Sequence, residues 1–162
     1  MNCENCGAPM KSTIDDAEYL CEFCSSTTPA KTPEDLIQVL QDPCGFVCPL
    51  CKVPLASATI LGAPACYCQN CGGVLVRQEI FVAVVDILRA RARGPGISPK
   101  PIPSEQLQRR IDCPSCGELM HTHPYLGPGN FVIDLCTACK NVWLDKGEIT
   151  AIALSPGRDR KT

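Results

Sequence analysis

Twelve cysteines in six Cys-x-x-Cys pairs constrain this sequence more than any other feature. The pairs form three couples, with 14, 16 and 19 residues between their halves. The couples are Cys3 and Cys6 with Cys21 and Cys24, Cys48 and Cys51 with Cys68 and Cys71, and Cys113 and Cys116 with Cys136 and Cys139. Two such pairs about 15–20 residues apart are typical of a four-thiolate metal site. The sequence therefore predicts three metal sites of the same kind.

The spacing suits tetrahedral coordination, because one tight turn can present two sulfurs to one ion at about 2.3 Å. Gly7, Gly72 and Gly117 directly follow their pairs, where a residue without a Cβ can take positive φ. We expect three zinc ribbons, each a short β-hairpin with two zinc knuckles and one Zn²⁺. Four protein thiolates leave no open coordination position, so the predicted sites are structural. Four cysteines also suit iron in a rubredoxin-like site, and the spacing does not separate the two metals.

Composition favours metal over disulfides as the use of these cysteines. The chain has 162 residues, 14 cysteines and only eight Phe, Trp or Tyr residues, so a large aromatic core is not expected. The N-terminus lacks the pattern of a signal peptide, and the longest apolar run, residues 80–85, is too short to span a bilayer. We therefore expect a cytoplasmic protein without a membrane span, in a compartment where disulfides are rare.

The run "WLDKGEI" follows the last cysteine pair and predicts a short helix over 146–154. Asp145 would be its N-cap, and Glu148 would reach back to the N–H of the cap, as in a capping box. Trp143 would pack its ring against the preceding hairpin, whose strand alternates Phe131, Ile133 and Leu135 on one face. A catalytic role for the paired acids is less favoured, because capping uses both, and we predict no catalytic residue.

The third unit carries a family resemblance. "CPSCGELM" followed by "CTACKNVWLDKGEI" resembles the bacterial zinc-finger family named after the zinc ribbon of transcription initiation factor IIB. Lys140 and Asn141 stand where that family usually has glycines, and the second unit has Leu75 and Val76 in place of Trp143 and Leu144. The resemblance implies tandem zinc ribbons but no particular biochemical role.

Two cysteines and two histidines remain outside the couples. Cys44 and Cys66 each lie just before a ligand pair. They could be buried apolar residues, alternative zinc ligands or partners in a mutual redox bond. His121 and His123 would lie on one side of a strand and are expected to face solvent rather than a metal.

The expected fold class is small and metal-stabilised, with three tandem zinc ribbons joined by helices and a Pro/Gly-rich linker. A helix over 77–93 is predicted by its apolar stripe, in which Val84 and Leu88 would contact another ribbon, another copy or a partner. The predicted divisions are zinc ribbon 1 at 1–27, a linker helix at 28–43, zinc ribbon 2 with its helix at 44–93, a basic Pro/Gly-rich linker at 94–110, zinc ribbon 3 with its capped helix at 111–155, and a tail at 156–162.

The preferred function is a non-catalytic adaptor that binds a protein partner through the helix at 77–93, with a homo-oligomer left open. One alternative is a nucleic-acid-binding or transcription-associated protein, and a further one is a thiol- or metal-handling protein. Charge disfavours nucleic acid: twelve thiolates and three Zn²⁺ ions together bring the formal net charge from −2 to −8. Arginines at 89–110 make that segment basic within a chain that is acidic as a whole.

Overall fold

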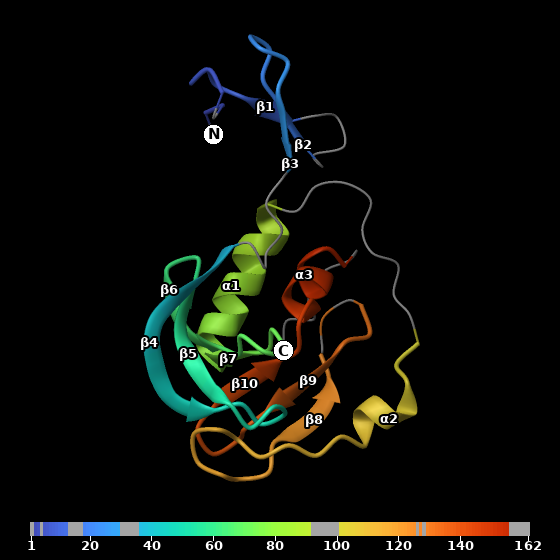
Figure 1. Ribbon diagram of the computed structural model, residues 1–162. Helices are drawn as coiled ribbons and strands as arrows, with labels where there is room; N and C mark the ends of the chain where they lie inside the picture. The colour runs from blue at the N-terminus through green and yellow to red at the C-terminus, as the bar shows by residue number, and fades with distance from the viewer. Residues whose placement is uncertain are drawn as a thin grey trace.

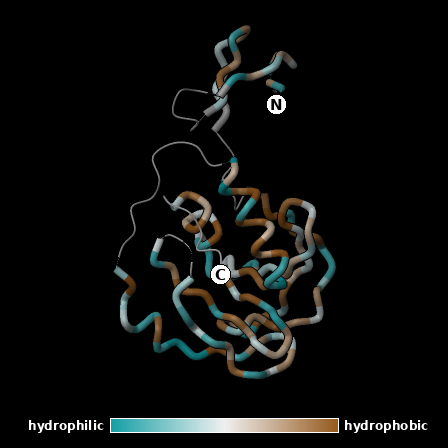
Figure 2. Tube along the Cα trace, turned by 180° about the vertical axis from the view of Figure 1, so that it is seen from behind, coloured by the Kyte–Doolittle hydropathy of each residue, from teal (hydrophilic) through white to brown (hydrophobic). Residues whose placement is uncertain are grey.

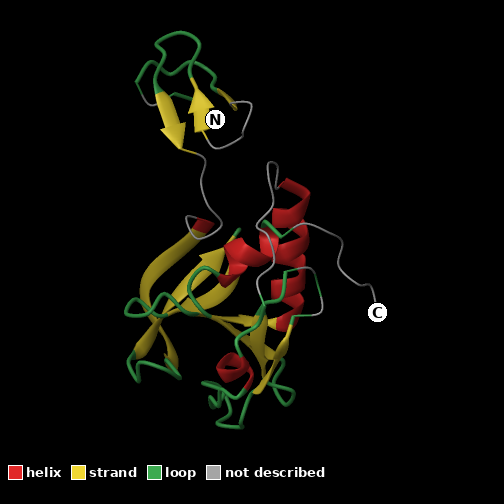
Figure 3. Ribbon diagram, turned by 90° about the vertical axis from the view of Figure 1, so that its right-hand side faces the viewer, coloured by secondary structure: helices red, strands yellow, loops and turns green. Residues whose placement is uncertain are grey.

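The computed structural model describes residues 2–3, 5–12, 18–29, 36–91, 101–125, 127 and 129–155. These residues form two antiparallel sheets (Figures 1 and 3). The turns next to the smaller sheet carry the first cysteine couple. The strands of the smaller sheet are β1 (Lys11–Ser12), β2 (Glu18–Leu20) and β3 (Thr27–Pro29), in that order. Among the residues that the structure describes, its buried core is Cys3, Met10 and Cys21, with Ala8, Tyr19 and Cys24 packed against them. So small an apolar core needs a metal to hold it.

The second and third couples belong to one seven-stranded sheet with the order β4-β5-β6-β7-β10-β9-β8. Its strands are β4 (Ile37–Val47), β5 (Pro54–Ile60), β6 (Ala63–Tyr67), β7 (Val74–Arg77), β8 (His121–Pro124), β9 (Val132–Leu135) and β10 (Asn141–Leu144). The prediction of separate tandem ribbons therefore does not describe these two units. Each contributes a meander, and the two meanders join edge to edge.

The two meanders join where β7 pairs with β10, and equivalent residues meet there. Leu75 is the fourth residue after Cys71, Trp143 is the fourth after Cys139, and these two lie directly opposite each other. Val76 opposite Val142 and Val74 opposite Leu144 continue the antiparallel register. The two units are thus related by a local two-fold relationship through the Leu75–Trp143 pair, as in a dimer built from one chain.

Two helices cover one face of this sheet, α1 (Gln78–Arg91) and α3 (Glu148–Ala153), as Figure 1 shows. The predicted helix at 77–93 is confirmed for Gln78–Arg91, whereas Arg77 is the last residue of β7. Figure 2 shows hydrophobic residues gathered on these helices and on the strands beneath them. The side chains that α1 buries are Phe81, Val84, Val85 and Leu88, and they pack in one cluster with Val74, Val76, Val142, Leu144, Ile149 and Ile152.

Of the three predicted contacts of the helix at 77–93 (another ribbon, another copy or a partner), the structure shows the first, because the apolar stripe packs against residues of the third unit. Val84 and Leu88 lie in the chain's own core, because the joined sheet supplies the apolar surface that a single ribbon would lack. The helices are also tied together: Nη1 of Arg89 donates to the carbonyl oxygen of Ile152 at 3.0 Å.

The linker helix predicted at 28–43 is wrong from residue 37 onward, where the chain forms β4. Thr28 and Pro29 of the predicted helix belong to β3, and residues 30–35 lie outside the described residues. Ile37 pairs with Ile60 and Val39 with Ala58, so a ladder to β5 replaces local helical bonds. The tertiary pairing outweighs a weak local helix preference.

The basic linker at 94–110 is described only from residue 101, and it contains the short helix α2 (Ser104–Leu107). The predicted tail at 156–162 lies outside the described residues. No helix in the described ranges is long and apolar enough to cross a membrane.

Candidate metal centres

The structure brings together all twelve cysteines predicted as ligands, in the three predicted groups of four. Within each group the sulfurs lie within 4.8 Å of one another. The Sγ atoms of Cys6 and Cys21 are 3.4 Å apart, and those of Cys48 and Cys71 are 3.8 Å apart. Tetrahedral thiolates at about 2.3 Å from a metal would be roughly 3.8 Å apart. The donor sets therefore fit one tetrahedral ion each, and thiolate donors suit zinc or iron.

All six cysteine pairs adopt the same turn. In the pair Cys48–Cys51, the N–H of Lys52 donates to the carbonyl of Cys48 at 3.0 Å, and the N–H of Cys48 donates to the carbonyl of Val53 at 2.8 Å. The five other pairs repeat both bonds. The residue after each pair has positive φ, and these residues are Gly7, Ser25, Lys52, Gly72, Gly117 and Lys140.

The sequence identified only half of these left-handed positions, namely the three glycines. At Ser25, Lys52 and Lys140 the same turn forces an L-residue into a conformation that costs about 1–2 kcal/mol. Coordination of the two cysteines of a turn by one metal ion would offset this conformational cost.

Some thiols in each centre are predisposed to ionise. The hydroxyl and N–H of Ser26 lower the pKa of Cys24 to about 6. At Cys136 burial raises the pKa, but the N–H of Cys139 and the neighbouring thiols outweigh it and bring the value to about 7. The backbone N–H groups of Cys71 and Asn70 act against burial in the same way and lower the pKa of Cys68. Since the thiolate is the metal-binding form, each centre has one thiol whose lowered pKa favours metal binding, whereas burial and neighbouring thiols raise the pKa of others such as Cys139.

The second and third centres share one buried cluster on the face of the sheet opposite the helices. Leu75 and Trp143 lie in this cluster together with the ligands Cys48, Cys68 and Cys113. The predicted burial of Trp143 is confirmed, since its side chain is wholly buried. Its ring also contacts the second unit, because a Cβ on Gly73 would be 2.2 Å from Cζ2 of Trp143. The tryptophan therefore links the two centres rather than anchoring one ribbon.

Asp145 is not the side-chain cap that the sequence predicts. α3 begins at Glu148 with Gly147 at the N-cap, and no side chain caps it. The Asp145 carboxylate instead accepts hydrogen bonds from both terminal nitrogens of Arg109 and, at 3.1 Å, from Nε1 of Trp143. Half of the predicted capping box is present, since the N–H of Asp145 donates to Glu148 at 2.7 Å.

Arg109 is the residue of this region that sequence reasoning missed. It ion-pairs with Asp145 and, at 3.3 Å, with the buried Asp134. The single hydroxyl hydrogen of Thr122 has two acceptors within reach, the carboxylate of Asp134 and, at 3.0 Å, the carbonyl oxygen of Arg109. The sequence places Arg109 only in a basic linker, and tertiary contacts bring two carboxylates to it.

Two carboxyl groups near Arg109 resist ionisation. Burial raises the pKa of Glu148 to about 8, with the Asp145 carboxylate adding to the shift. Burial also raises the pKa of Asp134, although Thr122 and Arg109 oppose the shift. The positive charge of the Arg109 guanidinium is thus shared by three neighbouring carboxyl groups, and ionising all three at once is unfavourable.

The remaining candidates lie outside the four-cysteine groups. Cys44 and Cys66 are half-buried and pack against the cluster that contains the second centre. His121 is exposed and His123 half-buried on β8, and neither joins a metal-binding group among the described residues.

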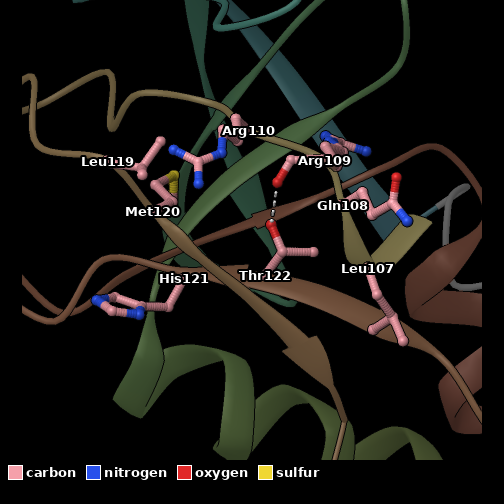
Figure 4. Close-up of a pocket in the computed structure, with 8 residues that line it drawn as sticks. All are labelled: Leu107, Gln108, Arg109, Arg110, Leu119, Met120, His121 and Thr122. Atoms are coloured by element: carbon pink, nitrogen blue, oxygen red, sulfur yellow. Dashed lines mark hydrogen bonds between the residues drawn. The ribbon is translucent and has the colours of Figure 1, made fainter. Parts of the chain in front are cut away.

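A pocket beside the third centre contains none of the predicted ligands (Figure 4). It is lined by Leu107, Gln108, Arg109, Arg110, Leu119, Met120, His121 and Thr122. Figure 4 shows the Thr122 hydroxyl bonded to the carbonyl of Arg109 across it. No thiol or carboxylate lines this pocket, so we assign no chemistry to it.

Comparisons with protein-family models, curated proteins and solved structures found no match to this chain, so its relation to the zinc-finger family remains a prediction from its motifs.

Proposed function

We propose that this chain is a non-catalytic zinc-binding adaptor that holds an extended segment of a protein partner along the outer edge of β4. The observation that carries the proposal is the exposed, apolar character of that edge strand. β4 stands at one end of the seven-stranded sheet and pairs only with β5 among the described residues. Its side chains Val39, Leu40 and Val47 are 39%, 45% and 48% exposed.

One part of β4 lacks the devices that normally protect an edge strand. Such strands are usually blocked by charge, proline or bulges. Asp42, Pro43 and two register shifts, one between Val39 and Pro43 and one between Pro43 and Val47, interrupt β4 after Val39. Residues 37–41, Ile-Gln-Val-Leu-Gln, carry no charge and no proline. An added strand would find backbone groups for hydrogen bonds there, with Val39 and Leu40 for side-chain contacts.

A non-catalytic role is supported by the chemistry of the donor sets. Each metal would take four protein thiolates, which leaves no coordination position for water or substrate. The metals would then stabilise the sheet, so that the edge strand β4 is held in place for the partner segment.

Nucleic acid is a weaker candidate for the partner. The formal charge of the zinc-loaded chain is −8, and Arg109 is already paired with carboxylates. A protein that binds the phosphates of a nucleic acid needs basic side chains that are free to contact them.

The test is selection of a phage-displayed random peptide library on the immobilised zinc-loaded chain. We expect enriched peptides with alternating apolar residues, whose binding changes little with salt. Leu40→Lys and Val39→Lys should abolish binding, because a charge on the edge blocks strand addition. Binding should also slow amide exchange over 37–41.

Val82→Lys is the matched control, since Val82 is half-exposed on α1 rather than on β4. It should leave peptide binding unchanged. If the selected peptides bind the Leu40→Lys variant normally but no longer bind the Val82→Lys variant, the binding site lies on the outer face of α1 instead. Salt-sensitive binding of an oligonucleotide without any peptide enrichment would overturn the proposal.

A further inference from the structure

The second and third units begin in the same way. Val47 immediately precedes the first cysteine pair of the second unit and pairs with Pro54. Asp112 immediately precedes the first cysteine pair of the third unit and pairs with Leu119, at the same spacing along the chain. The chain therefore enters both units at the same place. We call residues 108–112 the entering segment of the third unit.

Beyond this bridge the two units differ. In the second unit the pairing continues with Pro43 opposite Ala56, because the chain there forms β4. The equivalent residues of the third unit are Gln108 and His121. These two do not pair, since β8 pairs only with β9 among the described residues. Both line the pocket of Figure 4, which therefore lies where the second unit has a closed strand pair.

The basic groups of this pocket stand where the second unit has small residues. Arg110 and Gly45 each lie three residues before the first cysteine of their unit, and His121 and Ala56 each lie eight residues after it. Arg110 belongs to the entering segment and His121 to β8, so the two reach the pocket from its two walls (Figure 4). The third unit thus combines an open pocket with a basic lining.

No acidic side chain of the described chain lines the pocket. Glu105 and Asp112 are near Arg110 in the sequence, but neither is part of the lining. Arg110 forms no ion pair with any described residue, whereas Arg109 is already paired with two carboxylates. The Arg110 guanidinium is therefore available to an anion, and its planar fork matches a carboxylate in two parallel hydrogen bonds.

The remaining lining is largely apolar. Met120 is buried, and Leu107 and Leu119 are exposed side chains that flank it in the pocket. The volume of about 380 Å³ falls within the range of roughly 300–1,000 Å³ that is usual for small-ligand sites. An apolar lining with a few polar groups suits a ligand that has one charged head and an apolar stem.

We propose that this pocket binds a carboxylate on a short apolar stem, either a free acid or the C-terminal residue of a peptide. Arg110 pairs with the carboxylate, and a ring N–H of His121 donates a second hydrogen bond to it. Leu107, Leu119 and Met120 contact the stem. The pocket offers no group for a reaction, so its role is binding alone. β8 and β4 stand at opposite ends of the sheet, so the proposal does not depend on the partner-binding function.

The test titrates the zinc-loaded, ¹⁵N-labelled chain with hexanoate and with N-acetyl-leucine, and follows the backbone amide shifts by NMR. We expect both acids to shift amides within 107–110 and 119–122. Hexanamide and N-acetyl-leucinamide keep the stems but lose the charge, and each should bind at least about tenfold more weakly than its acid. Tighter binding of hexanoate would identify a free acid as the ligand, and tighter binding of N-acetyl-leucine would identify a peptide C-terminus.

Arg110→Ala should weaken the binding of both acids by about tenfold, because it removes the charged donor. His121→Ala, which copies Ala56 of the second unit, should weaken it less. Arg91→Ala is the matched control, since it removes the same charge from the exposed end of α1 and should leave the affinity unchanged.

The shifts of the wild-type chain are decisive even where a variant fails to fold. The proposal is overturned when neither acid binds, when acids and amides bind equally, or when the shifts lie outside the pocket. It is also overturned when Arg91→Ala weakens binding as much as Arg110→Ala.

Discussion

The ring of Trp143 occupies the space that a side chain on Gly73 would need, with Cζ2 only 2.2 Å from an added Cβ. Gly73 belongs to the second knuckle of the second unit, and Trp143 lies on a strand of the third. The absence of one methyl group in one unit thus lets the largest side chain of the other bury completely.

Gly73→Ala should lower the free energy of unfolding of the zinc-loaded chain by about 1–3 kcal/mol, because the buried ring cannot move away. Chemical denaturation at a fixed excess of zinc measures this. Trp143→Leu, which copies Leu75 of the second unit, should cost less in the Gly73→Ala background than alone. Strictly additive effects would show that the two residues are not in contact.

Asp145→Ala should destabilise the chain by about 1.5–3 kcal/mol, since it removes a charged acceptor from Arg109 and from the Trp143 indole. All zinc should stay bound, as Asp145 is no ligand. Asp145→Asn keeps an acceptor for the indole and should cost less. Loss of one metal ion per chain in either variant would show that Asp145 is a ligand.

Val84→Asp should unfold the large sheet or destabilise it by about 3–5 kcal/mol, because it buries an unpaired charge in the core beneath α1. Val82→Asp, two residues earlier on the exposed side of the same helix, should change stability by about 0.5 kcal/mol or less. Thermal denaturation of the two variants checks this. If both substitutions lowered stability by the same small amount, the apolar stripe of α1 would not be buried in the core.

Glu148 should make the chain less stable as pH rises through neutrality. Its folded-state pKa of about 8 lies above its ordinary value of 4.5, so between these values the folded chain binds more protons than the unfolded chain. Stability should fall with a slope of at most about 1.4 kcal/mol per pH unit, and the loss is complete above pH 8.

Glu148→Gln keeps an acceptor for the N–H of Asp145 and cannot ionise, so it should flatten this slope. Unfolding measured from pH 6 to pH 9, where thiolates keep their zinc, checks the prediction. A slope identical to that of the wild type would show that Glu148 is not the group responsible for the pH dependence.

Elemental analysis should find three zinc ions per chain, one for each group of four cysteines. A strong chelator should abolish the circular dichroism of the folded chain, because the first unit in particular has almost no core without metal. Iron in place of zinc would give a red protein. A spectrum unchanged after metal removal would contradict metal-dependent folding.

The sequence by itself determined the local features of this protein. Cysteine spacing identified the three ligand groups, because two thiols in one tight turn is a local constraint. Apolar periodicity likewise identified α1, since fourteen helical residues need no distant partner to be recognised. The hydrogen bond from the N–H of Asp145 to the Glu148 carboxyl group is likewise a contact between neighbouring residues, and the sequence predicted it.

Only the tertiary structure decided what these features contact. Leu75 opposite Trp143 joins two units that the sequence presents as separate, and this junction turns the stripe of α1 inward. Arg109 and Asp134 are distant along the chain, so neither reveals the other. The region around Ile37 became a strand because β5 supplied backbone partners that no local signal encodes. Local turns depend on neighbouring residues, whereas strand pairing and buried ion pairs depend on the whole fold.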